Sequence, residues 1–223
     1  MKLSNDTISI LKNFASINSN LVFREGNCIK TISEAKNIMA SASIEELIPM
    51  DFGIYDMGEF LSVLDMMDDP EIAIEKDRIN ISSSNQRVQY FTAPENILTS
   101  PSKDINMPTP EVAFNLSNSV ISSLKRAAST FGVDDVVIRS DGGPIHIDVT
   151  SNDNPTSNVY TVCIDQSSDD PFRAVFNINN FRFMPGDYVV NVSSRLISTF
   201  QCKEERHGIL YHVALEKNST FGE

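Results

Sequence analysis

Apolar residues recur at helical spacing in the segment that begins at residue 3. Leu11, Phe14 and Ile17 follow this spacing, and we expect them to form the buried face of a helix. Ser4 or Asn5 can cap its N-terminus. The opposite stripe is polar, with the residues Ser9, Lys12, Asn13 and Ser16.

The segment that begins at residue 116 repeats this layout. Nine of fourteen positions are identical between LSNDTISILKNFAS and LSNSVISSLKRAAS, at a constant offset of 113 in a chain of 223. The expected apolar face is Val120, Leu124, Ala127 and Phe131, and the polar face is Ser122, Lys125, Arg126 and Ser129. Periodicity alone accounts for shared apolar positions, but it does not require the matching Leu-Ser-Asn cap or the matching lysines. We therefore predict an internal duplication.

Strand-like sequence follows both predicted helices, at 21–23 and 136–138. SDGGP (140–144) and the segment 75–82 are typical of hairpin turns. A looser repeat relates 50–64 to 174–188, and each copy predicts an apolar strand followed by a second helix. The expected helix cap is Asp56 in the first copy and Asn179 or Asn180 in the second. Alternating strands follow in YVVNVSS, TFQCKE and GILYHVAL. Two helices among many strands in each half predict an α+β fold with mostly antiparallel sheets.

Four prolines lie in the nineteen residues APENILTSPSKDINMPTPE (93–111). Such a segment favours an extended connector, either a plain linker or one wall of a docking groove for partner peptides. The expected organisation is an N-terminal domain at 1–95, a connector at 96–110 and a C-terminal domain at 111–223.

The charge is unevenly distributed. The chain has 41% hydrophobic and 22% charged residues and a net charge of −12, which by itself argues against nucleic-acid binding. Yet 7–24, 112–133 and 171–186 contain no acidic residue, and they cover three of the four predicted helices. Their charges are all positive, whereas the helix with Glu59 and Asp65 has no base. The polar faces of the three helices in the acid-free segments are either ordinary solvated faces that lack acids by chance, or they form a weakly positive surface for loose, sequence-independent phosphate contact.

Motifs for enzymatic chemistry are missing from the sequence. We find no GxxxxGK[ST], GxGxxG, GxSxG or HExxH motif. His207 and His212 are interpreted as structural, and Cys28, Cys163 and Cys202 form no CxxC pair, which favours a reducing cytosol. No apolar run approaches the roughly 18 residues that span a membrane. We expect a protein without enzymatic activity, metal or cofactor.

MKLSNDTISILKNFASINS resembles the N-terminus of the sliding clamps of T4-type bacteriophages. The similarity continues through MDFGIYDMGEFLSVL, LKRAAS and NINNFRFMPGDY to HVALEKNST, and so covers nearly the whole chain. The resemblance implies a DNA-clamp fold with two similar domains, each with two helices backed by sheets. It also implies a homotrimeric ring in which the helices line a hole around duplex DNA, which is then held by topology and without sequence preference.

The resemblance also implies site residues. Lys12, Arg126 and Arg182 match basic positions on channel helices of the family, Lys125 is added because the internal repeat aligns it with Lys12, and Lys2 is a weaker match. The partner-peptide groove would lie near the connector and the last strands. Its candidate residues are Ile97, Leu98, Met107, Val213 and Leu215.

The implied partners are the phage DNA polymerase, an ATP-driven clamp loader and phage late-transcription factors, in the cytoplasm of the infected bacterial host. No membrane is implied. Two other hypotheses stay open at this point. One is an acidic protein that mimics DNA and captures a basic partner, and the other is a small-molecule enzyme with an unrecognised site.

Overall fold

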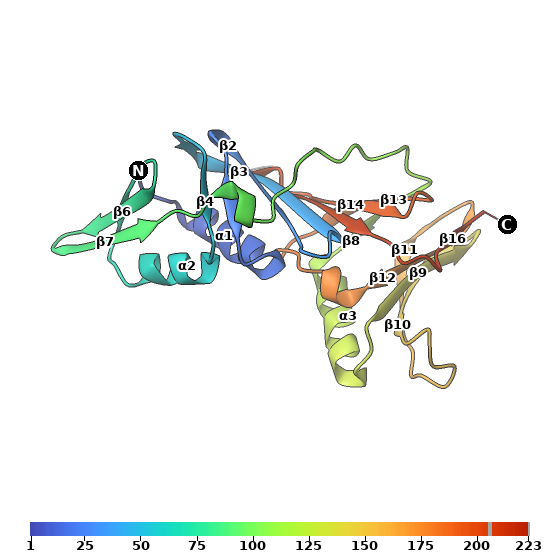
Figure 1. Cartoon of the computed structure of the whole chain (residues 1–223). Helices are drawn as coiled ribbons and strands as arrows, with labels where there is room; N and C mark the ends of the chain where they lie inside the picture. The colour runs from blue at the N-terminus through green and yellow to red at the C-terminus, as the bar shows by residue number, and fades with distance from the viewer. Residues whose placement is uncertain (205–206, 223) are drawn as a thin grey trace. The chain divides into compact units, whose positions relative to one another are not determined.

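The structure is a computed structural model that describes residues 1–204 and 207–222 (Figure 1). The chain divides into two compact units. Unit 1 comprises residues 1–104 and 207–209, and unit 2 comprises residues 105–204 and 210–222. None of the helices in the described residues is long and apolar enough to cross a membrane.

Unit 1 combines two α-helices with antiparallel strand pairs. β1 pairs with β4, β2 with β3, and β5, β6 and β7 form a three-stranded sheet. The elements are α1 (Asn5–Ile17), β1 (Leu21–Phe23), β2 (Gly26–Ile32), β3 (Ile38–Ile48), β4 (Phe52–Ile54), α2 (Met57–Asp65), β5 (Glu71–Ile74), β6 (Arg78–Ser83), β7 (Gln86–Phe91) and the 3-10 turn η1 (Glu95–Ile97).

Unit 2 has one α-helix and two antiparallel strand groups, β11-β10-β9-β12-β16 and β15-β14-β13-β8. The elements are β8 (Val112–Leu116), α3 (Asn118–Phe131), β9 (Asp135–Asp141), β10 (Pro144–Thr150), β11 (Tyr160–Ser167), β12 (Pro171–Asn177), the 3-10 turn η2 (Ile178–Asn180), β13 (Tyr188–Ser193), β14 (Ile197–Cys202), β15 (Leu210–Ala214) and β16 (Thr220–Phe221). The α+β fold with antiparallel sheets is confirmed, and so is the predicted hairpin at 140–144, which joins β9 to β10.

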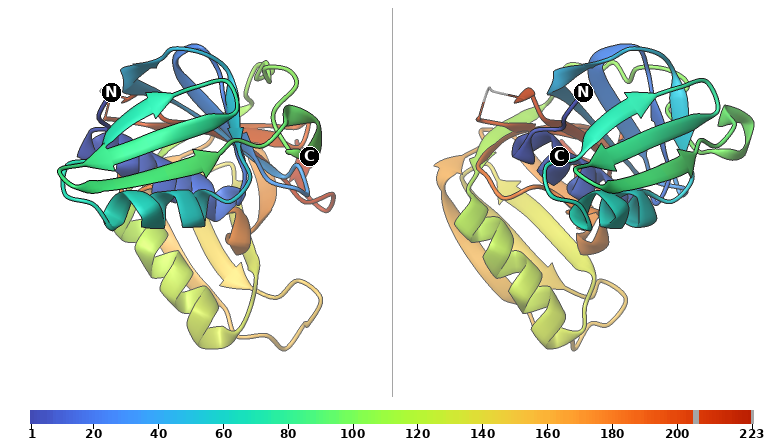
Figure 2. Two further views of the ribbon diagram at one scale, coloured as in Figure 1. Left: turned by 60° about the vertical axis from the view of Figure 1, so that its left-hand side comes forward. Right: turned by 90° about the vertical axis from the view of Figure 1, so that its left-hand side faces the viewer.

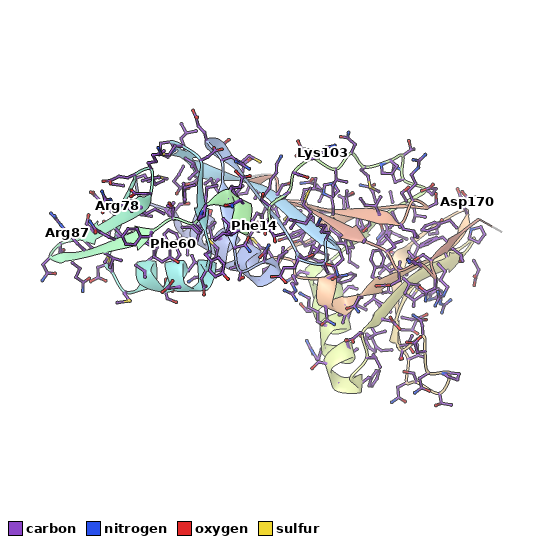
Figure 3. The ribbon with its side chains drawn as sticks, viewed as in Figure 1. Phe14, Phe60, Arg78, Arg87, Lys103 and Asp170 are labelled. Carbon is purple, nitrogen blue, oxygen red and sulfur yellow. The ribbon has the colours of Figure 1, made fainter. Side chains whose placement is uncertain are left out.

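α1 forms as the sequence predicts. The Ser4 side chain caps it by accepting from the Thr7 backbone N–H, and Leu11, Phe14 and Ile17 are buried together with Ile10. α1 packs against α2, which buries Phe60, Leu61 and Leu64 behind its Asp56 cap. Figure 2 shows the two helices side by side, and Figure 3 shows Phe14 and Phe60 within this unit.

The buried face of α3 differs from the prediction. Leu124 and Ala127 are buried as expected, but Ile121 and Ala128 complete the face. Val120 is half-buried, and Phe131, at 38% exposure, stays at the surface. The small Ala127 and Ala128 side chains allow α3 to pack closely on β10 and β11. Phe131 is the last helical residue, before the left-handed C-cap Gly132, so it lies beyond the sheet contact of the helix.

The prediction of a second α-helix in the C-terminal half is wrong. Only the 3-10 turn η2 forms, and its cap is Asn177 rather than Asn179 or Asn180. Phe181 and Phe183 are both buried, whereas Arg182 between them is exposed, and the backbone at Phe181, with φ −82° and ψ 51°, is not helical. Phe183 packs 4.6 Å from Phe200 between ring centroids. Pro185 also disfavours helical geometry at the residue before it.

Glu46 on β3 holds the first turn of α1. Its carboxylate accepts from the Thr7 hydroxyl at 2.6 Å and from the Ser4 backbone N–H. Desolvation pushes the pKa of Glu46 upward, but these hydrogen bonds outweigh it and hold the pKa below the ordinary value of 4.5. The ionised carboxylate is therefore part of the folded state near neutral pH.

Replacing Glu46 by Gln should lower the free energy of unfolding at pH 7 by about 1 kcal/mol, because one charge-assisted hydrogen bond becomes neutral and the amide NH2 group of Gln cannot accept the other. The folded-state pKa is depressed, so the carboxylate stabilises the fold above its unfolded-state pKa, and this contribution is lost as the pH falls through the folded-state pKa. Urea unfolding from pH 7 to pH 3 should show the two proteins converging in acid. Glu34→Gln, in an exposed turn, is the control. A constant difference at every pH would contradict this role.

Candidate nucleic-acid interface

The exposed face of α1 carries one positive charge. Lys12 is exposed, with the exposed Ser9 and Ser16 one turn to either side. Both hydroxyls donate to backbone carbonyls of their own helix, Ser9 to Asn5 at 2.8 Å and Ser16 to Asn13 at 2.6 Å. The serines therefore cover backbone oxygens that would repel phosphate, and Lys12 supplies the charge.

The exposed face of α3 carries two positive charges. Lys125 and Arg126 are exposed, and α3 contains no acidic residue. Ser123 and Thr130 donate to the carbonyls of Ser119 and Arg126, as the serines of α1 do on their helix. Desolvation lowers the pKa of the Lys125 ammonium group. In the part of the chain that the structure describes, neither base has an acidic oxygen within 4.0 Å.

The other two predicted DNA-facing bases lie outside these helices. Arg182 is exposed in the non-helical segment after η2, where its Nε donates to the Asn179 carbonyl at 3.0 Å. Lys2 precedes α1 and forms an ion pair with Asp69, which raises the Lys2 pKa through the hydrogen bond between them. Neither base therefore projects from an α-helix. For Arg182 this differs from the resemblance, which implied a position on a channel helix.

Sequence analysis missed an acidic neighbour of α1. Asp65, the last residue of α2, accepts from Lys12, with 3.3 Å between Nζ and Oδ2. The sequence signals that α2 has acids and no base, but only the packing of α2 on α1 places one of those acids beside Lys12. α1 is free of bases other than Lys12, so this pair neutralises its positive face.

The structure places the predicted groove residues in different environments. Ile97, at the end of η1, is 56% exposed, and Met107 is half-buried. Leu98 packs directly over Gly53, where any side chain on the glycine would overlap its Cδ1. Val213 is completely buried and Leu215 nearly so, which corrects the expectation that these two side chains offer a docking surface.

A polar pocket of about 550 Å³ lies in unit 1 beside the start of the connector. Arg24, between β1 and β2, donates to Glu95 of η1 and to Asp51, and Lys30 on β2 donates to Asp104, so ion pairs hold η1 and the connector against this part of unit 1. None of the five predicted groove residues lines this pocket, and the groove stays a prediction. The lining residues are Val22, Arg24, Glu25, Cys28, Lys30, Glu95, Ser100, Pro101, Ser102, Lys103 and Asp104.

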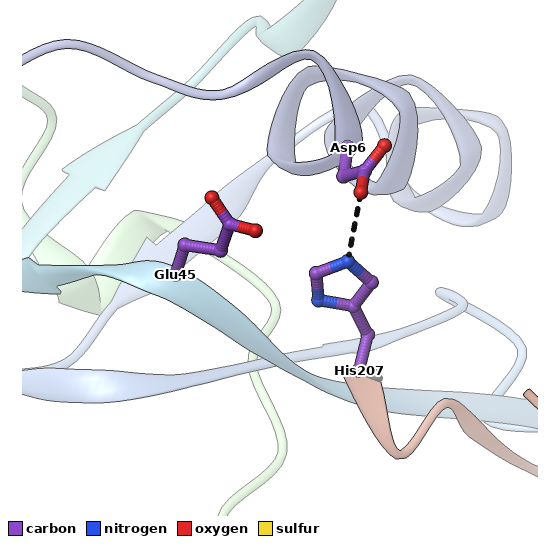
Figure 4. Close-up of side chains that lie close together, drawn as sticks. All are labelled: Asp6, Glu45 and His207. Carbon is purple, nitrogen blue, oxygen red and sulfur yellow. Dashed lines mark hydrogen bonds and ion pairs between the residues drawn. The ribbon is translucent and has the colours of Figure 1, made fainter. Parts of the chain in front are cut away.

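His207 lies among acidic side chains of unit 1, as Figure 4 shows. Its Nε2 is 3.3 Å from Asp6 Oδ2, its Nδ1 is 2.9 Å from the Ser43 carbonyl oxygen, and the Glu45 carboxylate is close by. Asp6 and Glu45 make further interactions of their own. Since a carbonyl only accepts, Nδ1 carries the proton in this contact. These bonds tie the 207 segment to α1 and β3, which agrees with a structural role for His207.

The comparisons with known proteins point to one family. The family model described as DNA polymerase processivity factor matches residues 4–107. The sliding clamp of Escherichia phage RB69 is 30% identical over 99% of both chains. That of Enterobacteria phage T4 is 29% identical over 99% of both, and that of Vibrio phage KVP40 is 29% identical over 90% of this chain and 94% of its own.

Solved structures support the fold independently. The proliferating cellular nuclear antigen of Entamoeba histolytica superposes with a TM-score of 0.68 at 12% identity, covering 94% of both chains. That of A. fulgidus, solved with the C-terminal region of FEN-1 bound, gives 0.68 at 15% identity and 96% coverage of both. This chain has the same clamp fold, and by its phage relatives it belongs to the sliding-clamp family, whose members are non-enzymatic processivity factors for DNA polymerase.

Proposed function

We propose that three copies of this chain close head to tail into a ring around duplex DNA in the cytoplasm of the infected bacterium. The ring tethers the phage replicative polymerase, is opened by an ATP-driven loader and also serves phage late-transcription factors. The observation that carries the proposal is the repeated helix, α1 and α3, whose exposed stripe beyond the first turn contains bases and no acid, in a chain of net charge −12.

The charge distribution supports topological rather than tight binding. Lys12, Lys125 and Arg126 are few, and helix side chains that lack a recognition element contact phosphates without reading bases. The acidic remainder of the surface repels DNA, so the duplex is favoured only at the positive faces. A protein that mimics DNA to capture a basic partner would explain the net charge, but it explains neither the acid-free segments 7–24 and 112–133 nor the membership of the clamp family.

Unpaired sheet edges support ring formation. In unit 1 the edge strand β7 pairs only with β6, and in unit 2 β11 pairs only with β10, among the described strands. Arg87 on β7 and Asp165 on β11 are exposed and of opposite charge, and Phe91 at the end of β7 is 67% exposed. We propose that β7 of one copy pairs with β11 of the next, because an edge from each unit gives the heterologous contact that a closed ring needs.

Light scattering across a dilution series should give three times the chain mass at high concentration. Phe91→Asp should shift the dissociation to at least tenfold higher protein concentration, because a charge would be buried in the interface. Leu47→Asp, at another exposed apolar residue of unit 1, should leave the mass unchanged. A monomer at every concentration of the unmodified protein would refute the homotrimer.

The triple variant Lys12→Ala, Arg126→Ala, Arg182→Ala should keep the ring but reduce loading or processive synthesis severalfold at moderate salt, because phosphate contacts are lost. The matched control is Lys36→Asn, Arg195→Ala, Lys217→Ala, which removes the same charge from other exposed positions. Asn suits residue 36 because its φ is 57°. Primer extension on long circular templates measures the effect. Equal product lengths for the triple variant and the unmodified protein would remove these bases from the DNA-facing surface.

Ile97→Glu should weaken capture of the polymerase about tenfold or more without changing the native mass, because an exposed apolar anchor near the connector is replaced by a charge. Leu47→Glu serves as the control, since Leu47 is at least as exposed in the same unit. Surface plasmon resonance of the polymerase on immobilised clamp separates the two variants. Unchanged affinity for Ile97→Glu would place the groove elsewhere.

A further inference from the structure

The two repeated helices carry matching bases, but their acidic surroundings differ. Lys12 on α1 lies 3.3 Å from Asp65, and Lys2 just before α1 pairs with Asp69. On α3, Lys125 and Arg126 have no acidic oxygen within 4.0 Å among the described residues. The segment 65–69 therefore brings two carboxylates to Lys12 and Lys2 of unit 1, whereas the described residues bring none to Lys125 or Arg126 of α3.

The core of unit 1 fixes the position of Asp65. Asp65 is the last residue of α2, whose Phe60, Leu61 and Leu64 are buried against neighbours that include α1. A negative charge at the C-terminal end of a helix opposes the helix dipole, so Asp65 does not stabilise its own helix. Lys12 compensates for that unfavourable charge.

The pair remains open to exchange with solvent ions. The Lys12 side chain is 52% exposed and the Asp65 side chain 61% exposed. Exposed ion pairs of this kind are weak, so a DNA phosphate can compete for the ammonium group. However, any phosphate that reaches Lys12 also meets the Asp65 carboxylate at close range and is repelled by it.

We propose that Asp65 is a resident counter-ion of Lys12, which restricts phosphate contact at α1 and leaves α3 as the main phosphate-binding helix of each subunit. This inference rests on the proposed encirclement of DNA. A lysine already neutralised by a carboxylate releases fewer DNA counter-ions when it binds, so α1 adds little to the affinity or to its salt dependence. In a ring, helices whose lysine is neutralised by a carboxylate would alternate along the inner wall with helices whose bases are available to phosphate.

The direct test is Asp65→Asn, with Asp68→Asn as the matched control. Asp68 is exposed, three residues away from Asp65, and has no basic partner within 4.0 Å among the described residues. Its substitution therefore removes the same charge without freeing a lysine. Fluorescence anisotropy of a short labelled linear duplex, titrated with assembled ring at low and at physiological salt, measures the affinity. Asp65→Asn should bind about three- to tenfold more tightly and with a steeper salt dependence, and Asp68→Asn should change binding by less than about twofold.

Lys12 variants identify the origin of the gain. Lys12→Ala in the otherwise unmodified chain should weaken binding less than Lys125→Ala does, because Asp65 already compensates part of the charge of Lys12. Lys12→Ala added to Asp65→Asn should abolish the increase. An equal increase for Asp65→Asn and Asp68→Asn, or an increase that survives Lys12→Ala, would overturn the proposal. Native mass and thermal unfolding of each variant confirm that the compared proteins are assembled and folded.

The double variant Lys125→Ala, Arg126→Ala separates this inference from the proposed function. It should weaken duplex binding at least about tenfold, since α3 supplies the uncompensated charges. If this variant binds like the unmodified protein, the proposed DNA-facing surface is wrong. If it binds weakly while Asp65→Asn behaves like Asp68→Asn, encirclement stands and only the counter-ion role of Asp65 falls.

Discussion

Burial of one face of α1 and of α3 fixes the orientation of the charged surface. Leu11 and Phe14 on α1, and Leu124 and Ala127 on α3, are held in the cores of their units, so the opposite stripes with Lys12, Lys125 and Arg126 must face outward. Rotation of either helix would expose apolar side chains and bury a charge. The direction of the bases is thus a consequence of hydrophobic packing, and electrostatics acts on a surface that packing has already defined.

Weak attraction is a physical requirement for a protein that must hold DNA and also move along it. Each strong phosphate contact adds a barrier that has to be crossed at every step along the duplex. The small number of bases on the α-helices and the carboxylate beside Lys12 would both limit the depth of such barriers at these helix faces. Closure of a ring would supply the persistence that such contacts do not provide.

Local signals in the sequence were sufficient for much of the architecture. Ser4, Asp56 and Ser117 cap the three α-helices, and the Gly-rich turn at 140–144 joins β9 to β10. The α3 face was only partly predicted, because Ala127 and Ala128 are too small for periodicity to show which of them meets the sheet.

The remaining differences depend on contacts between segments distant in sequence. The non-helical path around Arg182 follows from a cluster of rings assembled from several strands, and the Lys12–Asp65 pair follows from the packing of two helices. Periodicity within either helix says nothing about which residue of the other helix will lie opposite. For the same reason, Val213 was a groove candidate as an apolar residue in the last strands, whereas its side chain is part of the core.

Adjacent residues at the start of the connector have opposite environments. Leu98 is seated on the bare backbone of Gly53, and Ile97 beside it faces solvent. The connector therefore begins from a fixed point, and the backbone that carries its first exposed apolar side chain is held in place before any ligand arrives. A partner that binds at Ile97 meets a preorganised anchor and avoids much of the entropic cost of ordering a flexible loop.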